Sequence, residues 1–316
     1  MFKNQLFLIY LSKSLFLMHR NIIYFINPIS GTKGKKLLVE LIEKKTRKQF
    51  FAFQILPTNA EGDYHFLKDK IAYERITDVV ICGGDGTVSQ IAGALIDEPV
   101  NIGIIPMGSG NGLALAAKIP RDIDKAIDLI FKGKPSFVDA FFINSTFSCM
   151  LCGLGFDDQF AHDFELQKNR GLTNYIKQTI RNFFKAKPYQ FEIINKNQRF
   201  SVDAYFISIA NSNQFGNQFT IAPKANLSDG LLDIVIVKKM SKFKLLWAIL
   251  KQIKNGEIAE YNEGSFHKKD VLYFQTSRLL INNKSNAPLH IDGEPVATAF
   301  KFAIQVIPRA FKLLQE

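Results

Sequence analysis

The chain has 316 residues, 47% of them hydrophobic and 22% charged, and this composition excludes an intrinsically disordered protein. A chain of this length can bury a sizeable core and is expected to form two domains. The net charge of +11 predicts attraction to polyanions, whether nucleic acid, nucleotide or an anionic membrane, and charge alone does not separate these. The 29 Phe favour an apolar surface that meets lipid or another apolar substrate.

The first seventeen residues are apolar but are interrupted by Lys3 and Lys13. They are too short for a transmembrane helix and lack a small-residue cleavage site. The simplest interpretation is that translation begins at Met18 and that these residues are not part of the natural protein. The alternative is a weak extension that contacts a membrane. Nothing else approaches a spanning length, so we expect a cytoplasmic protein that is soluble or peripherally associated with a membrane.

From residue 21 to residue 118, strand, turn and helix patterns alternate four times. The predicted strands are residues 21–26, 51–56, 79–82 and 102–106, and a helix pattern follows each of them, the second opening at 58–63. This alternation predicts an open α/β sheet with ligands at the carboxyl ends of the strands.

Glycine-rich turns follow three of these strands at that same edge. Glycine there lets the backbone reach positive φ and lets a ligand approach closely, and amides at a helix start favour phosphate. In the run from Gly83 to Thr87, Asp85 cannot bind an anion directly, so it is expected to act through a cation, most simply Mg²⁺. The alternative for this run alone is a tight turn with a solvated Asp. The first of these turns, at residues 27–35, lacks the spacing of a Walker P-loop.

The three cysteines, Cys82, Cys149 and Cys152, are too few for a disulfide framework and suit a reducing compartment. Cys149 and Cys152 have the spacing of a redox motif, but their apolar run indicates a strand, where the thiols would face opposite sides. We therefore expect buried, inert thiols. The five His residues are scattered, so we expect no structural metal cluster.

From about Asp139 the pattern changes to strands separated by turn residues. The expected strands are residues 141–155, 190–195, 204–210, 232–238, 271–276, 279–282 and 300–307. This pattern predicts an antiparallel sheet or sandwich. We place an α/β domain at 18–138 and a β-sandwich domain at 139–307, with residues 308–316 packing back on the first.

Taken together, the motifs resemble the diacylglycerol kinase catalytic-domain superfamily, which also holds sphingosine kinases and small bacterial lipid kinases. The resemblance covers nearly the whole chain after Met18. The motifs that carry it are Asn27-Pro28-x-Ser30-Gly31, Gly83-Gly84-Asp85-Gly86-Thr87, Gly108-Ser109-Gly110-Asn111, Gly153-Leu154-Gly155-Phe156-Asp157, Ala222-Pro223-Lys224-Ala225, Ser228-Asp229-Gly230-Leu231-Leu232-Asp233 and Asp292-Gly293-Glu294.

The resemblance implies a Rossmann-like ATP-binding lobe, a β-sandwich lobe and an ATP- and Mg²⁺-dependent lipid kinase. Its acceptor would be a hydroxyl of diacylglycerol, a sphingoid long-chain base or a related lipid. The residues that would line the nucleotide are Asn27, Ser30, Gly31, Thr58, Gly83, Gly84, Asp85, Gly86, Thr87, Ser109 and Asn111. Asp85 would hold the catalytic Mg²⁺ through water.

Asp292-Gly293-Glu294 is by itself a strong hairpin-turn signal. In the bacterial relatives this acidic pair supplies the general base that accepts the proton of the lipid hydroxyl. We assign Glu294 as the base and Asp292 to its support, with the reverse assignment open.

Ser228-Asp229-Gly230 matches the family's structural Mg²⁺ loop. By resemblance, Asp229 would be a side-chain ligand and the carbonyls of Asn226 and Leu231 would complete the shell. A metal-free turn is the alternative.

One departure concerns the acceptor. Gly112 stands where bacterial diacylglycerol kinases have Asp, which brings this turn closer to the sphingosine-kinase form and puts an acyl substrate in doubt. Asp157 or Asp158 could then meet an amino-alcohol head group, and a solvated loop carboxylate is the alternative for both.

Residues 173–187 and the segment after Ser241 carry apolar residues at helical spacing with basic residues between them. Basic amphipathic helices bind anionic membranes. We interpret the first as membrane contact and the second as packing on the sandwich.

Two other functions compete with the lipid kinase. They are a soluble-substrate kinase of the NAD-kinase type and a non-catalytic nucleotide or lipid sensor, against which Asp85 and Glu294 argue. No nucleic-acid module is recognisable, and the sequence leaves a homodimer open.

Overall fold

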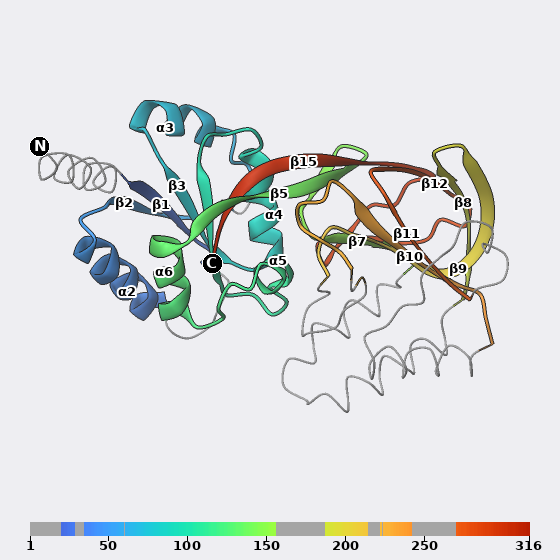
Figure 1. The fold of residues 1–316 in the computed structure, drawn as a ribbon, viewed down its shortest axis with the longest axis horizontal. Helices are drawn as coiled ribbons and strands as arrows, with labels where there is room; N and C mark the ends of the chain where they lie inside the picture. The colour runs from blue at the N-terminus through green and yellow to red at the C-terminus, as the bar shows by residue number, and fades with distance from the viewer. Residues whose placement is uncertain are drawn as a thin grey trace, which may run out of the picture. The chain divides into compact units, whose positions relative to one another are not determined.

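The computed structural model describes residues 20–28, 35–59, 61–155, 187–213, 222, 224–241 and 270–316, which Figure 1 shows as coloured ribbon. The chain forms two compact units. The first comprises Met1–Gly108, Lys118–Phe137 and Phe311–Glu316, and the second comprises Ser109–Ala117 and Val138–Ala310.

The first unit is built on a parallel sheet. Its strands are β1 (Asn21–Ile26), β2 (Ala52–Pro57), β3 (Asp78–Gly83) and β4 (Asn101–Pro106). β1 lies between β2 and β3, and β3 pairs with β4. The end of β15 (Lys301–Gln315) adds a further parallel strand beside β4. β3 is buried along its whole length, as expected for an inner strand of a covered parallel sheet.

Helices connect these strands, as parallel pairing requires. They are α2 (Lys35–Lys48), α3 (Phe66–Glu74), α4 (Asp85–Ala94) and α6 (Ile123–Lys132). α6 was not anticipated from the sequence. Its N-cap is Asp122, whose carboxylate accepts the amide of Lys125, and its Ile130 packs against Gly103 of β4.

The helix expected to open at residues 58–63 begins only at Phe66. The side chain of Asn59 explains the difference, because it accepts the amide of Glu61 at 2.9 Å and donates to the carbonyl of Asp63 at 3.1 Å. Such local bonds offer the backbone an alternative to helix.

The second unit consists of antiparallel strands whose buried apolar side chains form two clusters. They are β5 (Lys134–Ile143), β6 (Thr146–Ser148), β7 (Leu151–Leu154), β8 (Tyr189–Asn195), β9 (Gln198–Ala210), β10 (Leu232–Lys238), β11 (Val271–Thr276), β12 (Arg278–Asn283), β13 (Leu289–Ile291), β14 (Glu294–Val296) and the first part of β15. The short helix α5 (Gly112–Ala116) also belongs to this unit. The long strand β9 pairs with β8 through its first half and with β7 and β10 through its second.

Two predicted strands of this unit differ from the observed ones. The run expected as a strand over 141–155 contains the end of β5, then β6 and β7, with turns between them. The strand expected at 300–307 continues to Gln315, and its last residues join the sheet of the first unit. A parallel sheet with connecting helices and an antiparallel β unit together confirm the predicted fold class.

The three cysteines are buried and free. Burial raises the pKa of the thiols of Cys82 and Cys152 far above their usual range, so both stay protonated at neutral pH. The prediction of buried thiols is confirmed, although Cys149 lies in a bend between β6 and β7, not in a strand.

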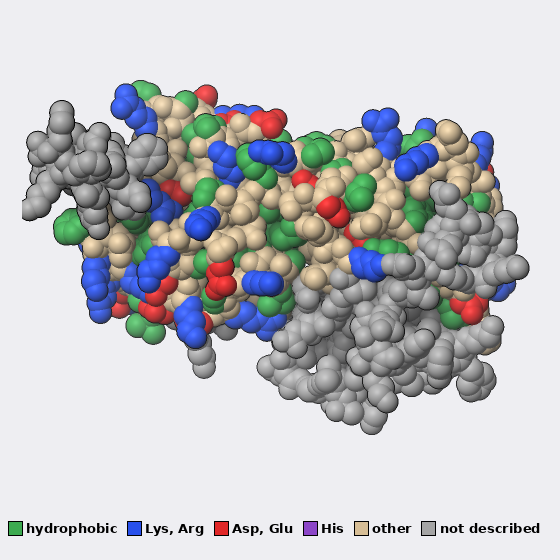
Figure 2. Space-filling view, in the orientation of Figure 1, with side chains coloured by type: hydrophobic (Ala, Val, Ile, Leu, Met, Phe, Trp, Pro, Cys, Tyr) green, Lys and Arg blue, Asp and Glu red, His purple; other side chains and the backbone are tan. Residues whose placement is uncertain are grey.

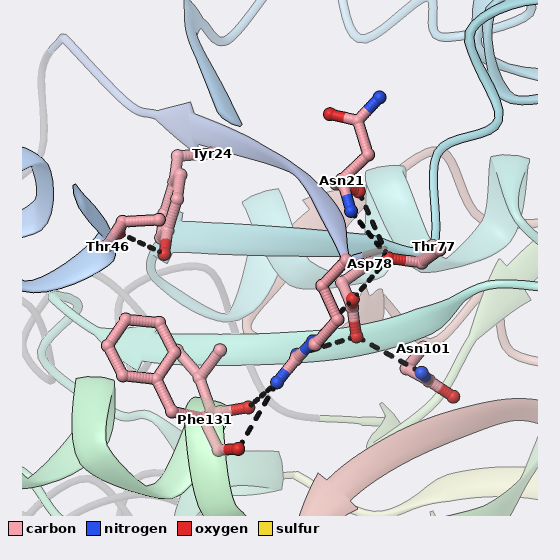
Figure 3. Close-up of polar contacts among 9 residues, drawn as sticks. Asn21, Tyr24, Thr46, Thr77, Asp78, Asn101 and Phe131 are labelled. Atoms are coloured by element: carbon pink, nitrogen blue, oxygen red, sulfur yellow. Dashed lines mark hydrogen bonds and ion pairs between the residues drawn. The ribbon is translucent and has the colours of Figure 1, made fainter. Parts of the chain in front are cut away.

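A buried carboxylate ties the first unit together at the amino end of its sheet (Figure 3). Asp78, whose side chain is 1% exposed, accepts hydrogen bonds from Arg20 Nε at 2.9 Å and Nη2 at 2.8 Å, and from the side chains of Thr77 and Asn101. Arg20 also donates to the carbonyls of Ile130 and Phe131 at the end of α6. The bidentate pair therefore links the sheet to a helix that covers it.

We expect Arg20→Met to destabilise the chain by about 3–5 kcal/mol, because it leaves the carboxylate of Asp78 buried without its countercharge. Urea unfolding followed by circular dichroism measures the loss. The control is Lys68→Met, which removes the exposed partner of a half-buried Glu98 at 3.6 Å and is expected to cost about 0–1 kcal/mol. Equal losses in the two variants would contradict the role given to Arg20.

A second buried carboxylate gives stability a pH dependence. Asp233 of β10 is fully buried and accepts hydrogen bonds from the Tyr273 hydroxyl and from Gln275 Nε2. Burial raises the pKa of Asp233 despite these bonds, and the nearby carboxylate of Asp229 raises it further. The pKa is higher in the folded than in the unfolded chain, so this contribution is present at low pH and is lost as pH rises through the folded-state pKa.

Asp233→Asn keeps an acceptor for Tyr273 but removes the charge. We therefore expect the variant to gain stability relative to the wild type as pH rises from about 4 to about 8, with little difference at the acidic end. Thermal unfolding across this range measures the difference in stability between the variant and the wild type, with the exposed Asp203→Asn as the control for loss of one negative charge. A difference that becomes smaller with rising pH would contradict the predicted direction.

Candidate active site

The predicted nucleotide residues of the first unit that the structure describes lie at the carboxyl edge of its sheet. Backbone hydrogen bonds join the strand ends there: Asn27 N donates to the Cys82 carbonyl at 3.1 Å, Thr58 N to Ile26 at 3.1 Å, and Met107 N to Gly83 at 2.9 Å. The Asn27 side chain also donates to the Thr87 hydroxyl at 2.9 Å. The edge therefore presents amide, hydroxyl and backbone groups from four neighbouring strand ends.

The junction of β3 and α4 is tighter than the sequence suggested. Gly83 ends the strand, Gly84 is the N-cap, and the helix begins at Asp85, so Gly86 and Thr87 already lie in its first turn. These glycines do not use their freedom to adopt positive φ: Gly84 has φ −96°.

These two glycines provide space. A Cβ on Gly83 would lie 2.8 Å from Cβ of Thr87, and a Cβ on Gly84 would lie 3.1 Å from Cα of Gly108. Glycine at residue 84 therefore allows the turn after β4 to lie directly against the start of α4.

The first turn of α4 suits a phosphate group. Its N-cap is Gly84, which makes no side-chain hydrogen bond to the helix, and the positive end of a helix dipole favours an anion. The carboxylate of Asp85 in the same turn would repel a phosphate unless a cation lay between them.

The donor set at Asp85 fits Mg²⁺. Within the described residues no group of three or more His, Cys, Asp and Glu could hold a metal ion, so a cation here would be held by at most two such described side chains. Mg²⁺ at phosphate sites is commonly held by one or two carboxylates, with water and phosphate oxygens filling its shell.

Ser109 and Asn111, which follow Gly108 in the chain, belong to the second unit. Asn111 adopts the left-handed conformation with φ 53° and precedes the short helix α5. This position explains a polar residue among glycines, since Asn tolerates positive φ better than most side chains.

In the second unit, Asp292-Gly293-Glu294 forms the turn of a β-hairpin. Ile291 of β13 pairs with Glu294 of β14, and Asp292 and Gly293 between them have φ of 50° and 90°. Positive φ at both central residues is typical of the type I′ turn that Asp-Gly favours. The hairpin prediction is confirmed, and it is compatible with a chemical role for the carboxylates.

The two carboxylates of this turn have different surroundings. Asp292 is 8% exposed, and its Oδ1 accepts Ser148 Oγ at 2.7 Å, Leu151 N at 3.0 Å and Met150 N at 3.3 Å. Glu294 is exposed. Asp292 is therefore engaged with the protein, whereas Glu294 faces solvent, where a substrate could reach it.

The predicted structural Mg²⁺ loop is a turn held by its own side chains. Asp229 accepts the amide of Leu231 at 3.0 Å, and Asn226 accepts the amide of Ser228 at 3.1 Å. Gly230, with φ 73°, donates its amide to Asp139 at 2.6 Å.

Burial and then the charge of Asp139 raise the pKa of Asp229. A hard cation would favour the charged form of the Asp229 carboxylate.

Several predicted residues lie outside the described part of the chain. They are Ser30, Gly31, Asp157, Asp158, nearly all of residues 173–187, the segment after Ser241 and residues 1–17. Among the described residues, no helix is long and apolar enough to cross a membrane. Figure 2 shows Lys and Arg dispersed among acidic side chains on the visible face of the described residues.

The sequence did not reveal the buried polar residues of the second unit that hydrogen-bond to its turns and bends. Asp139, Ser148 and Asn211 are all buried and hydrogen-bonded across long chain separations. The one available signal was an isolated polar residue at the end of an apolar run.

Two family models match the chain. One is described as the diacylglycerol kinase catalytic domain and matches residues 21–143, and the other is described as the YegS C-terminal NAD kinase beta sandwich-like domain and matches residues 154–315.

Relatives of known description cover most of the chain. A probable lipid kinase YegS-like from Shewanella frigidimarina is 29% identical over 256 residues, 79% of each protein. The diacylglycerol kinase of Bacillus subtilis is 24% identical over 273 residues, 85% of this chain and 88% of that protein.

The fold has a solved counterpart. A crystal structure of a diacylglycerol kinase from Bacillus anthracis matches with a TM-score of 0.72 over 94% of this chain and 97% of that one, at 18% identity. The second family model alone spans about half of the chain, and the first matches the residues before it. The chain therefore belongs to the diacylglycerol kinase family, with a diacylglycerol kinase catalytic domain followed by a YegS-type β-sandwich domain.

Proposed function

We propose that the chain is an ATP- and Mg²⁺-dependent lipid kinase that transfers the γ-phosphate of ATP to a lipid hydroxyl. The observation that carries the proposal is the start of α4, where backbone amides and Asp85 lie at the sheet edge against the turn after β4. Phosphoryl transfer depends on positioning and charge neutralisation, and these groups supply both.

The phosphate side of the reaction uses residues of the first unit. Amides of the first turn of α4 would bind phosphate oxygens, and Asn27, Thr58 and Thr87 would contact the nucleotide from the same edge. Ser30, Gly31, Ser109 and Asn111 are assigned to the nucleotide by resemblance. Asp85 would hold Mg²⁺ through water, and the ion would supply positive charge for the phosphates.

The acceptor side uses the hairpin of the second unit. Glu294 would accept the proton of the lipid hydroxyl as that oxygen bonds to the γ-phosphorus and the bond to the β–γ bridging oxygen breaks, releasing ADP. Asp292 would serve as a support, since its Oδ1 already accepts three hydrogen bonds.

The lipid is assigned only by class. Diacylglycerol and a sphingoid base both present a hydroxyl beside long apolar chains, and Gly112 favours the second over the first. Asp157 or Asp158 would then bind the amino group. The net charge of +11 favours peripheral contact with an anionic membrane in the cytoplasm, where such a substrate would be met.

A second Mg²⁺ would stabilise the loop at residues 226–231. Its ligands would be the carboxylate of Asp229 and the carbonyls of Asn226 and Leu231, and it would relieve the repulsion between Asp229 and Asp139. Its role would be structural.

The acceptor class is tested with purified protein, labelled ATP and either total lipid extract or NAD. We expect label in a lipid product, identified by mass spectrometry.

The same assay tests two site residues. Asp85→Asn is expected to abolish phosphoryl transfer, and Glu294→Gln is expected to lower kcat by about 100- to 10,000-fold while the affinity for ATP is kept. The exposed Glu40→Gln is the charge-matched control.

Each unexpected result would contradict a different part of the proposed function. Label in NAD would favour the NAD-kinase alternative, and unchanged transfer by Asp85→Asn would remove the catalytic role of that residue. Absence of transfer to any acceptor by a folded protein that binds ATP would favour the sensor alternative.

The close approach of the two glycine turns gives a separate prediction. Gly84→Ala puts a Cβ 3.1 Å from Cα of Gly108, so one backbone segment must move. We expect a loss of about 1–3 kcal/mol in stability and weaker ATP binding, measured by calorimetry.

The control is Gly93→Ala in the same helix, which is expected to stabilise it by about 0.5–1 kcal/mol. If both variants bind ATP as the wild type does, the contact between the turns does not shape the nucleotide site.

A further inference from the structure

We propose that Ser148 and Asn211 are positioning residues for the acceptor base. They hold the bend between β6 and β7, and through it the Asp292-Gly293-Glu294 turn, so that Glu294 meets the substrate hydroxyl in a fixed place. The inference rests on the proposed role of Glu294 and names the residues that make that role geometrically possible.

The first observation is the convergence of donors on one oxygen of Asp292. The hydroxyl of Ser148 at 2.7 Å and the amides of Leu151 at 3.0 Å and Met150 at 3.3 Å all donate to Oδ1. The amide of Asp292 donates in return to the Leu151 carbonyl at 2.9 Å. The bend and the turn are therefore joined by four hydrogen bonds, one of which comes from a side chain that can be exchanged without altering the backbone.

The second observation is that the other side of the same bend is held as well. Asn211 Nδ2 donates to the carbonyl of Cys149 at 3.1 Å, and the amides of Asn211 and Ser212 donate to the carbonyl of Met150 at 2.8 and 3.0 Å. Both partners of Asn211 Nδ2 are carbonyl oxygens, so the amide cannot be reversed. The bend is thus fixed from the end of β9 on one side and from Asp292 on the other.

Asn211 connects this arrangement to the centre of the unit. Its Nδ2 also donates to the carbonyl of Asp139 at 2.7 Å, while the carboxylate of Asp139 accepts the amides of Arg309 at 2.7 Å and Gly230 at 2.6 Å. Asn211 and Asp139 are both buried. A buried, hydrogen-bonded path therefore runs from β5 and β15 to the turn that carries Glu294.

This arrangement matters for chemistry because a general base must lie within hydrogen-bond reach of the proton it accepts. The side chain of Glu294 is exposed, and Glu294 is the first residue of β14, so its position is set by the hairpin that carries it. Its location depends on the turn, and the turn depends on Asp292. A displacement of about 1 Å at a reacting group can cost about 100-fold in rate.

The test compares two serine-to-alanine variants of the full chain. Ser148→Ala removes the hydroxyl that donates to Asp292. Ser208→Ala removes a hydroxyl that is equally buried, on β9, and has no hydrogen-bond partner. We expect Ser148→Ala to lower kcat for lipid phosphorylation about 10- to 100-fold with KM for ATP unchanged, and Ser208→Ala to leave kcat unchanged.

A double-mutant cycle separates positioning from general damage. If Ser148 acts through Glu294, adding Ser148→Ala to Glu294→Gln causes little further loss in kcat, whereas a merely structural defect multiplies the two losses. Ser148→Cys keeps a weaker donor of similar size and is expected to lie between Ser and Ala, which also covers the case in which the Ala variant does not fold.

The outcomes separate the inference from the function on which it rests. Multiplying losses, or equal effects of Ser148→Ala and Ser208→Ala, would overturn the positioning role while leaving the kinase intact. A Glu294→Gln variant with full activity would instead remove the proposed base, and with it the group that Ser148 is said to position.

Discussion

A buried carboxylate that accepts several hydrogen bonds is the interaction on which both units depend. Asp78 does this in the first unit, where Arg20, Thr77 and Asn101 surround it. Asp139 and Asp292 do so in the second, largely with backbone amides as donors. An isolated buried charge is costly, so each of these carboxylates fixes the segments that supply its donors.

The carboxyl edge of the first unit's sheet depends on a different constraint, which is the absence of side chains at two glycines. Gly83 and Gly84 do not adopt unusual backbone angles, and their importance lies in the contacts that a Cβ would make with Thr87 and Gly108. The carboxylates fix segments by bonds, whereas the glycines let two turns approach. An ATP site needs both properties, because the amides must be close together and must not move.

The sequence predicted the elements whose signals are local. The runs at residues 232–238 and 271–276 coincide with β10 and β11, because apolar residues there are bounded by turn residues. The helix expected at 58–63 failed because Asn59 makes local bonds that a periodicity argument does not weigh. The bonds of Asp292 could not be predicted, since Ser148 lies 144 positions away and an apolar strand pattern gives no sign of its partner.

The Asp-Gly-Glu motif shows why a structural and a chemical interpretation need not compete. A type I′ turn requires positive φ at two consecutive residues, and Asp-Gly meets this requirement. The same turn brings Asp292 inward to the Ser148 bend and begins β14 with an exposed Glu294. Because Asp292 lies in the turn and is held there on its buried side, whereas Glu294 begins the strand after the turn and is exposed, the hairpin can present one carboxylate to a substrate while the other keeps it in place.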